Sequence, residues 1–263
     1  MSTAAAEPGT TADDLNYDDY THDFMGKVGN IQDFSRDFLV GLARVFEDVL
    51  NFMPYAHVKI YSEKVGINAA MDVAAAVSRA GMRQVMPMGR FIAPPPGWDW
   101  KDAQYQAIPF DVQTEDLTKP ALIRLIKTYW DQYLKGHNYF IDQWTKIIPP
   151  EEEVWLGLPD MYQLIIDYQY PKLAKVFKIE PVHVVDFLKL AVLSIDGTLG
   201  YGGEYIVYNP DHVVLNMRRC EVLQKYTDEG LYPPARAWMN CTFEQRISAP
   251  FFPGLQSGDQ SSA

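Results

Sequence analysis

Apolar residues recur at helical spacing through the N-terminal part of the chain. In residues 30–52 they return every three or four positions, which predicts a helix with Asn30 as its N-cap. Pro54 suits the first turn of a second helix, and Gly66 suits its C-terminal end. A third helix, rich in Ala and Met, is expected from Asn68. The N-terminal part is therefore expected to be a set of packed helices.

Residues 93–117 interrupt this pattern with four prolines and no clean period, which predicts a long loop. Loops of this length inside a compact domain are usually functional. Trp98 and Trp100 favour a packed lid over the next helix, and the alternative is a loop that covers a hydrophobic flank. That helix is expected from Thr118 to Pro149.

The sequence "PPEEEVW" predicts another helix start, because prolines and then acidic residues suit the positive end of a helix dipole. Two more helical segments are expected around 160–177 and 181–195. A period of two appears only afterwards, on both sides of Asn209-Pro210-Asp211, and predicts a β-hairpin at about 203–219. This order predicts an α+β fold with a mostly helical N-terminal two-thirds and a small antiparallel sheet near the C-terminus.

The ends of the chain differ in composition from its middle. Residues 1–17 are small, polar and acidic, which predicts a disordered tail, and 256–263 are expected to be a flexible C-terminal tail. A single α+β domain is expected over 18–255.

The charge excludes several partner classes. A formal net charge of −11 and a pI near 4.9 argue against nucleic acid and anionic membrane surfaces, which need basic residues. The apolar runs are too short to span a bilayer, and the first residues lack the features of a secretory signal. Two cysteines do not make a disulfide framework, so we expect a cytoplasmic protein. The high aromatic content suits either a small-molecule pocket or the surface of a homo-oligomer.

Familiar catalytic motifs are missing from the sequence. The glycines of "GTLGYGGEY" precede a strand rather than a helix, which excludes a phosphate-binding loop, and there is no G-x-S-x-G or H-E-x-x-H. His137, His183 and His212 each stand alone, so each is expected to be a hydrogen-bonded structural histidine.

Cys220 is the best candidate for chemistry. It ends a predicted strand and precedes "EVLQKYTDEG", and a helix there would favour a thiolate through its N-terminal dipole. Arg218 adds positive charge nearby, and a reversal at "LYPPAR" would return Cys241 to the same place. A low thiol pKa is what a nucleophile or a metal ligand needs. The alternative is that both cysteines are buried small hydrophobic residues.

The candidate site residues fall into three groups. The catalytic candidates are Cys220, Cys241 and His57. The candidates for substrate contact are Trp98, Trp100, Tyr129, Tyr133, Tyr205 and Arg218. If a metal ion is the cofactor, Cys220 and Cys241 would be its ligands, with others from distant helices.

The C-terminal third also carries a family resemblance. The succession "GLPDMYQLI" and "YIVYNPDHVVLNMRRCEVLQKYTDEGLYPPARAWMNCTFEQRISAPFFPGL" resembles the L-2-amino-thiazoline-4-carboxylate hydrolase-like family and its relatives. It is more distantly similar to four-vinyl-reductase-type ligand-binding domains. "EKVGINAAMDVAAAVSRAGMRQ" looks like the family's early helix–glycine–helix passage. The resemblance implies that Cys220 and Cys241 match the two family cysteines.

Three functions are compatible with these features. The first is a hydrolase-like enzyme, a hydrolase or lyase, that acts on a ring or a C–N or C–S bond of an apolar, aromatic or alicyclic metabolite. The second is a non-catalytic small-ligand-binding or sensor domain. The third is a structural subunit of a larger enzyme assembly. Fast alkylation of the cysteine near neutral pH would favour the first over the others.

Overall fold

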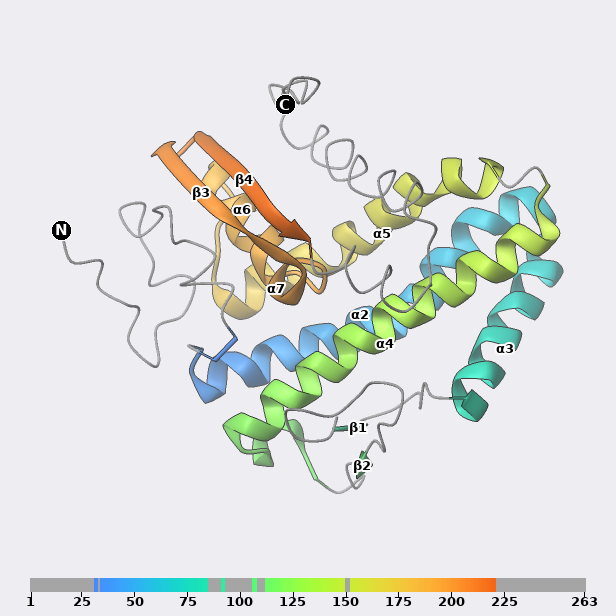
Figure 1. Cartoon of the computed structure of the whole chain (residues 1–263), viewed down its shortest axis with the longest axis horizontal. Coiled ribbons are helices and arrows are strands. Elements are labelled where there is room, and N and C mark those ends of the chain that lie inside the picture. The colour runs from blue at the N-terminus through green and yellow to red at the C-terminus, as the bar shows by residue number, and fades with distance from the viewer. Residues whose placement is uncertain are drawn as a thin grey trace.

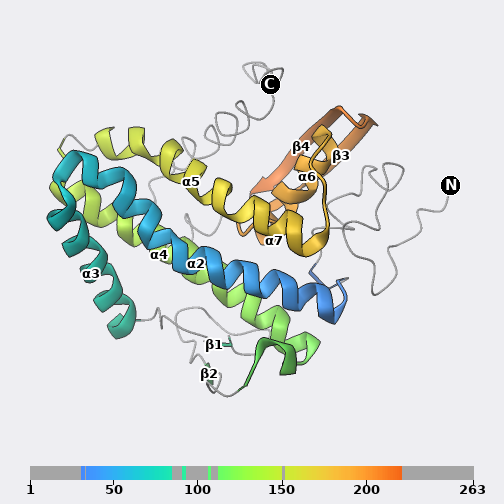
Figure 2. The same cartoon turned by 180° about the vertical axis from the view of Figure 1, so that it is seen from behind.

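Two long helices, α2 (Arg36–Val65) and α4 (Lys119–Ile147), lie side by side at the centre of the fold (Figure 1). α3 (Ile67–Gln84) packs against both of them, and α5 (Glu152–Phe177) packs mainly against α2. The view from behind shows the same arrangement (Figure 2). The computed structural model describes residues 31–32, 34–84, 91–92, 106–107, 112–149 and 152–220, and for 80–84, 91–92, 106–107, 152, 155, 199–208 and 214–220 the description concerns the backbone.

α2 is one continuous helix where the sequence predicts two, and that prediction is wrong. Pro54 lies inside the helix, and the N-cap is Ser35 rather than Asn30, with the Ser35 side chain accepting a hydrogen bond from the Phe38 backbone N–H at 3.2 Å. A proline inside a helix costs roughly 3 kcal/mol. The buried face of α2 nevertheless continues across it, because Met53 and later residues stay in the core. Packing of this face offsets the missing backbone hydrogen bond.

Gly66 ends α2 as predicted. Its φ of 84° lies in the region that favours glycine, and its backbone N–H donates to the Ser62 carbonyl at 2.8 Å. α3 begins directly afterwards at Ile67, one residue before the predicted start at Asn68.

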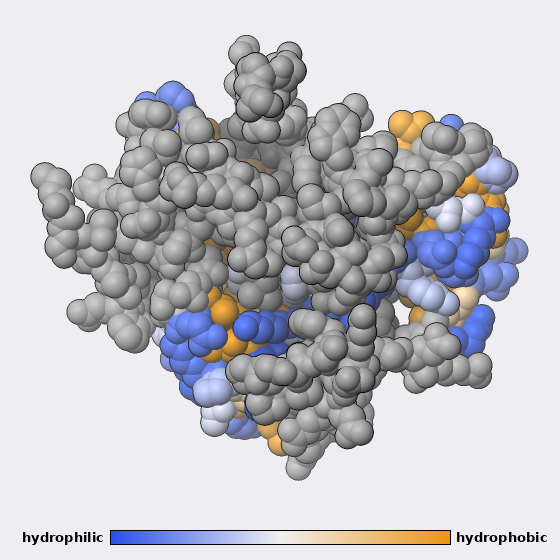
Figure 3. Space-filling model, in the orientation of Figure 1, coloured by the Kyte–Doolittle hydropathy of each residue, from blue (hydrophilic) through white to orange (hydrophobic). Residues whose placement is uncertain are grey.

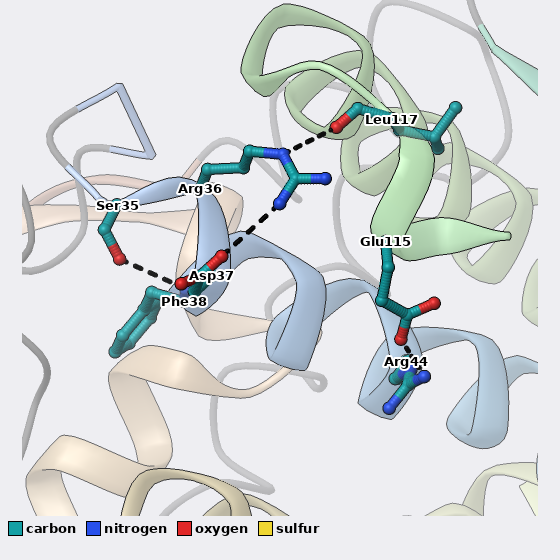
Figure 4. Close-up of polar contacts among 7 residues, drawn as sticks. All are labelled: Ser35, Arg36, Asp37, Phe38, Arg44, Glu115 and Leu117. Carbon is teal, nitrogen blue, oxygen red and sulfur yellow. Dashed lines mark hydrogen bonds and ion pairs between the residues drawn. The ribbon is translucent and has the colours of Figure 1, made fainter.

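Polar contacts connect the first turns of α2 to the segment that leads into α4 (Figure 4). Arg36 Nε donates to the Leu117 carbonyl at 3.0 Å, and Arg44 forms an ion pair with Glu115 of the 3₁₀ helix η3 (Thr114–Asp116). α4 then begins after Thr118, as predicted, and ends at Ile147. The short strands β1 (Phe91–Ile92) and β2 (Gln106–Ala107) pair antiparallel, and β1 contacts α4.

α5 is also continuous, with Pro159 and Pro171 in its interior, where the sequence predicts a helix start at "PPEEEVW" and a separate segment at 160–177. α6 (Val184–Leu193) and the short α7 (Gly197–Gly200) follow it. The chain continues into β3 (Tyr201–Asn209) and β4 (His212–Cys220), which pair antiparallel. The hairpin is attached to the start of α6, because the Val185 N–H donates to the Pro210 carbonyl at 3.0 Å.

The mostly helical character of the N-terminal part is confirmed. The α+β class of the whole chain and the single domain over 18–255 stay predictions, and the predicted tails at 1–17 and 256–263 lie outside the described residues. Within the described part, no helix has the length and hydrophobicity needed to cross a membrane. On the described surface in Figure 3, hydrophilic residues are interspersed with smaller hydrophobic areas.

Candidate functional site

A chain of four hydrogen-bonded side chains is buried between α2, α4 and α5. We call it the histidine chain, and its members are Trp144, His57, His137 and Tyr162. The Trp144 indole N–H donates to His57 Nδ1 at 3.2 Å. His57 Nε2 lies 3.0 Å from His137 Nδ1, and His137 Nε2 lies 2.9 Å from the Tyr162 hydroxyl. Each of the three helices contributes to this chain, so it exists only when they are packed.

The histidine chain is surrounded by buried aromatic side chains. The His57 ring stacks on Phe140 with ring centroids 4.3 Å apart, and the Tyr61 hydroxyl donates to the Val154 carbonyl at 2.7 Å. His57 and His137 are completely buried, whereas Tyr162 is partly buried. Among the four side chains of the histidine chain, Tyr162 is therefore the one that is partly exposed to solvent.

Burial keeps both imidazoles neutral. It lowers the pKa of His137 from 6.5 to about 3. Burial is also the main cause that lowers the pKa of His57 well below 6.5, and the neighbouring His137 adds to it. Removing a charged group from water disfavours its charged form, and the other groups in direct contact are aromatic rings without a full charge to compensate. The two rings can donate and accept hydrogen bonds, but they cannot serve as bases near neutral pH.

A second polar group lies one helical turn away along α4. We call it the Asp196 cluster, and it consists of Tyr133, Asp196 and Gln169. The Tyr133 ring stacks near His137 with centroids 6.2 Å apart, and its hydroxyl makes a long hydrogen bond of 3.5 Å to Asp196 Oδ2. The two polar groups are thus adjacent along one face of α4.

Gln169 has an incompletely bonded side chain. It is fully buried on α5, and its Oε1 accepts a hydrogen bond from the Ile195 backbone N–H at 3.1 Å. Its Nε2 has no acceptor among the described residues. An unpaired buried donor costs about 1–3 kcal/mol, so such a group is a reasonable place to look for a bound partner.

A tight turn holds Asp196 in place. The Gly197 N–H donates to Ser194 Oγ at 3.0 Å, and Thr198 Oγ1 donates to the Val192 carbonyl at 3.1 Å. A Cβ at Gly197 would lie only 1.9 Å from the Ala191 carbonyl oxygen, so the backbone leaves no room for a side chain there.

The strand register brings the backbone of Cys220 next to this turn. α7 (Gly197–Gly200) directly follows Asp196, and Tyr201 directly follows α7. Tyr201 is the antiparallel partner of Cys220, and such partners have Cα atoms about 5 Å apart. Both views show the end of β4 beside α7 (Figures 1 and 2). The backbone of Cys220 and the Asp196 cluster therefore lie in the same part of the molecule.

The other predicted site residues are distributed as follows. Tyr129 and Tyr133 are buried one turn apart on α4. Tyr205 lies in β3 opposite Leu215. Arg218 lies in β4 at the irregularity between the pairs Gly202–Arg219 and Gly203–Met217. Trp98, Trp100 and Cys241 lie outside the described residues, as does the predicted helix after Cys220.

His57 is held in the histidine chain, and none of its described contacts is with the hairpin. Among the described side chains, no three or more His, Cys, Asp or Glu residues form a group that could hold a metal ion. The side chains of the predicted pair Cys220 and Cys241 lie outside this described set, and their metal site stays a prediction.

Sequence reasoning missed the pairing of His137 with His57. His137 and His183 stand alone only in the sequence, since His137 lies beside His57 and His183 lies 2.8 Å from Asp211. The expectation that they are hydrogen-bonded is confirmed. For His57 and His137 the available signal was their position on the apolar faces of amphipathic helices, which shows burial but does not identify a partner 80 residues away.

Comparison of the chain with known protein families, with curated proteins and with solved structures gives no match.

Proposed function

We propose that the protein is a small-molecule enzyme, a hydrolase or lyase, that acts on a ring or a C–N or C–S bond of an apolar, aromatic or alicyclic metabolite. The observation that supports it is the pairing of Tyr201 with Cys220, because it puts the backbone of a candidate nucleophile beside the turn that carries Asp196. A nucleophile, a carboxylate and hydrogen-bond donors are the groups that such a reaction needs.

Each group has a role in this proposal. Cys220 attacks the electrophilic carbon of the ring as a thiolate, the C–N or C–S bond of the ring breaks, and the leaving heteroatom takes up a proton. Water then cleaves the bond between this carbon and the Cys220 sulfur, which regenerates the thiolate. Asp196 and the Tyr133 hydroxyl handle protons at the reacting atoms, since they already contact each other at 3.5 Å. The Nε2 donor of Gln169 stabilises a developing negative charge on the substrate.

The resemblance to the L-2-amino-thiazoline-4-carboxylate hydrolase-like family supports the same reaction class and suggests a first substrate. As part of the proposal, Cys220 and Cys241 hold a metal ion if one is the cofactor, and Trp98, Trp100, Tyr129, Tyr205 and Arg218 contact the substrate. We also propose a cytoplasmic homo-oligomer.

A non-catalytic ligand-binding or sensor domain is the second candidate. The neutral state of His57 and His137 favours it, because burial lowers the pKa of both imidazoles and neither can serve as a base near neutral pH. In that case the Asp196 cluster would hold a ligand without changing it.

Turnover of L-2-amino-thiazoline-4-carboxylate tests the proposal. Its consumption is followed by chromatography with the wild type, with Cys220→Ser and with the surface variant Lys146→Ala as the matched control. We expect consumption by the wild type and the control and none by Cys220→Ser. Binding without consumption by the wild type supports the second candidate, and full activity of Cys220→Ser contradicts the role of the cysteine.

A further inference from the structure

Two rows of side chains lie beside each other on the solvent-facing side of α2 and α5. The row on α2 consists of Asp48, Phe52, Tyr55 and Lys59, and intervals of four, three and four residues place them on one face of the helix. Tyr55 is 56% exposed, and its ring centroid lies 5.2 Å from that of Phe52. The row therefore has two aromatic rings in its middle and one charge of each sign at its ends.

The row on α5 follows the same pattern. It consists of Asp160, Leu164, Tyr168 and Lys172, at intervals of four residues. Leu164 and Tyr168 are partly buried hydrophobic residues, and Asp160 is exposed. An acid and a base thus again enclose two apolar side chains.

Contacts within the chain hold the two rows in register. Lys172 forms an ion pair with Asp48, and its Nζ lies 4.5 Å from the ring centroid of Tyr168. The rings of Phe52 and Tyr168 stack 4.0 Å apart and 3° from parallel. α2 and α5 are antiparallel neighbours (Figure 2), so the other ends of the two rows also lie at one level. We call these eight residues the α2–α5 strip.

The charges of the α2–α5 strip cancel, although the whole chain has a formal net charge of −11. Two copies of so acidic a chain repel each other over most of their surfaces. Contact between copies is most favourable where the local charge is zero and apolar side chains are exposed. Lys59 and Asp160 are exposed, and neither forms an ion pair within the described part of the chain, so both are available to a partner.

We propose that a second copy of this chain docks on the α2–α5 strip, with the helices of the two copies antiparallel. A two-fold axis through the middle of the strip brings Asp48 opposite Lys59 of the second copy. The same axis brings Phe52 opposite Tyr55 of the second copy, because both rings lie four residues inside the charged ends of their row.

The row on α5 is matched by the same axis. Lys172 comes opposite Asp160 of the second copy, and Tyr168 comes opposite Leu164 of the second copy. One axis serves both rows because the ring stack and the ion pair between α2 and α5 keep them in register. Apolar side chains are then enclosed by charged pairs, which is the usual arrangement of an interface core and its polar rim.

The α2–α5 strip gives the proposed homo-oligomer an interface. Its role does not depend on the proposed reaction, which uses none of these eight residues.

Sedimentation velocity of the full chain over a range of concentrations tests the interface. We expect a dimer of the wild type, and a dissociation constant raised at least about tenfold in Tyr55→Gln, because tyrosines at the centre of an interface contribute much of its binding energy. Val182→Gln is the matched control, since it replaces another exposed apolar residue, 72% exposed, outside the strip. A monomeric wild type, or equal dissociation constants in the wild type and Tyr55→Gln, overturns the proposal.

Two charge reversals test the antiparallel orientation. Asp48→Lys and Lys59→Glu each place like charges opposite each other when the variant pairs with itself, so we expect both to dimerise more weakly than the wild type. An equimolar mixture of the two variants places opposite charges at both positions. We therefore expect the mixture to form a heterodimer about as stable as the wild-type dimer.

Thermal melting followed by circular dichroism shows that each variant is folded. If both charge variants fold and their mixture does not associate, the proposal is overturned. If Asp48→Lys fails to fold, the comparison of Tyr55→Gln with the wild type decides. A monomeric wild type also removes the homo-oligomer from the proposed function, whereas the proposed reaction is decided by turnover.

Discussion

Acid is expected to destabilise the fold through His57 and His137. Both have a pKa in the folded protein below the ordinary value of 6.5, because they are buried without a compensating charge. In the unfolded chain they bind a proton near pH 6.5, so below this pH the unfolded state binds more protons than the folded state. The free energy of unfolding therefore falls as the pH decreases from 6.5 toward the folded pKa, which is about 3 for His137.

The size of the effect follows from the linkage relation. Each histidine changes the free energy of unfolding by roughly 1.4 kcal/mol per pH unit inside this window. Between pH 7 and pH 5 this amounts to about 2 kcal/mol for one histidine and about 4 kcal/mol for both. A typical domain is stable by about 5–15 kcal/mol, so the loss is easily measured.

Urea denaturation at pH 7, 6 and 5 is the assay, with the wild type compared with His137→Gln. Glutamine keeps a donor and an acceptor but does not titrate, so we expect the loss between pH 7 and 5 to be about 2 kcal/mol smaller in the variant. His212→Gln removes a histidine with an exposed side chain and is the matched control. An identical pH dependence in the wild type and His137→Gln would refute the reasoning.

Two further predictions concern the backbone. Gly197→Ala is expected to lower the free energy of unfolding, measured by urea denaturation, by more than the roughly 1–3 kcal/mol that overpacking typically costs. The reason is that the new Cβ would lie 1.9 Å from the Ala191 carbonyl oxygen. Gly157→Ala should cost less, since its Cβ would meet side-chain atoms at 3.0 Å or more, and a larger loss for Gly157 would contradict this order. Pro54→Ala should raise the melting temperature, because α2 regains the hydrogen bond to the Leu50 carbonyl and about 3 kcal/mol of helix propensity is available. A lower melting temperature of Pro54→Ala would contradict this expectation.

Local signals in the sequence predicted the helices and several of their ends. Gly66 and Thr118 mark ends that the structure also has, because a cap acts through its own neighbouring residues. Pro54 was misleading, since the apolar face of α2 packs over its whole length and outweighs a local penalty. The apolar face of α5 likewise continues past Pro159, so the separate segment predicted around 160–177 is part of one helix. The true N-cap, Ser35, lies within the predicted helix, because the apolar pattern begins earlier than the helix itself.

The candidate site was less predictable than the helices. Tyr133 was proposed for its aromatic character, but nothing in the sequence indicates its contact with Asp196, which is 63 residues away. The histidine chain is similar, since His57 and Trp144 come from different helices and meet only through tertiary packing. Gln169 was missed altogether, because a buried glutamine on an apolar helix face looks like an ordinary surface residue in the sequence.

The central claim is that Cys220 and Asp196 belong to one site. The alkylation rate of Cys220 near neutral pH, measured by peptide mapping in the wild type and in Asp196→Asn, tests it most directly. A nearby carboxylate disfavours a thiolate, so its removal should make Cys220 react faster, whereas the surface variant Asp48→Asn should leave the rate unchanged. Equal rates in the wild type and Asp196→Asn would contradict the claim.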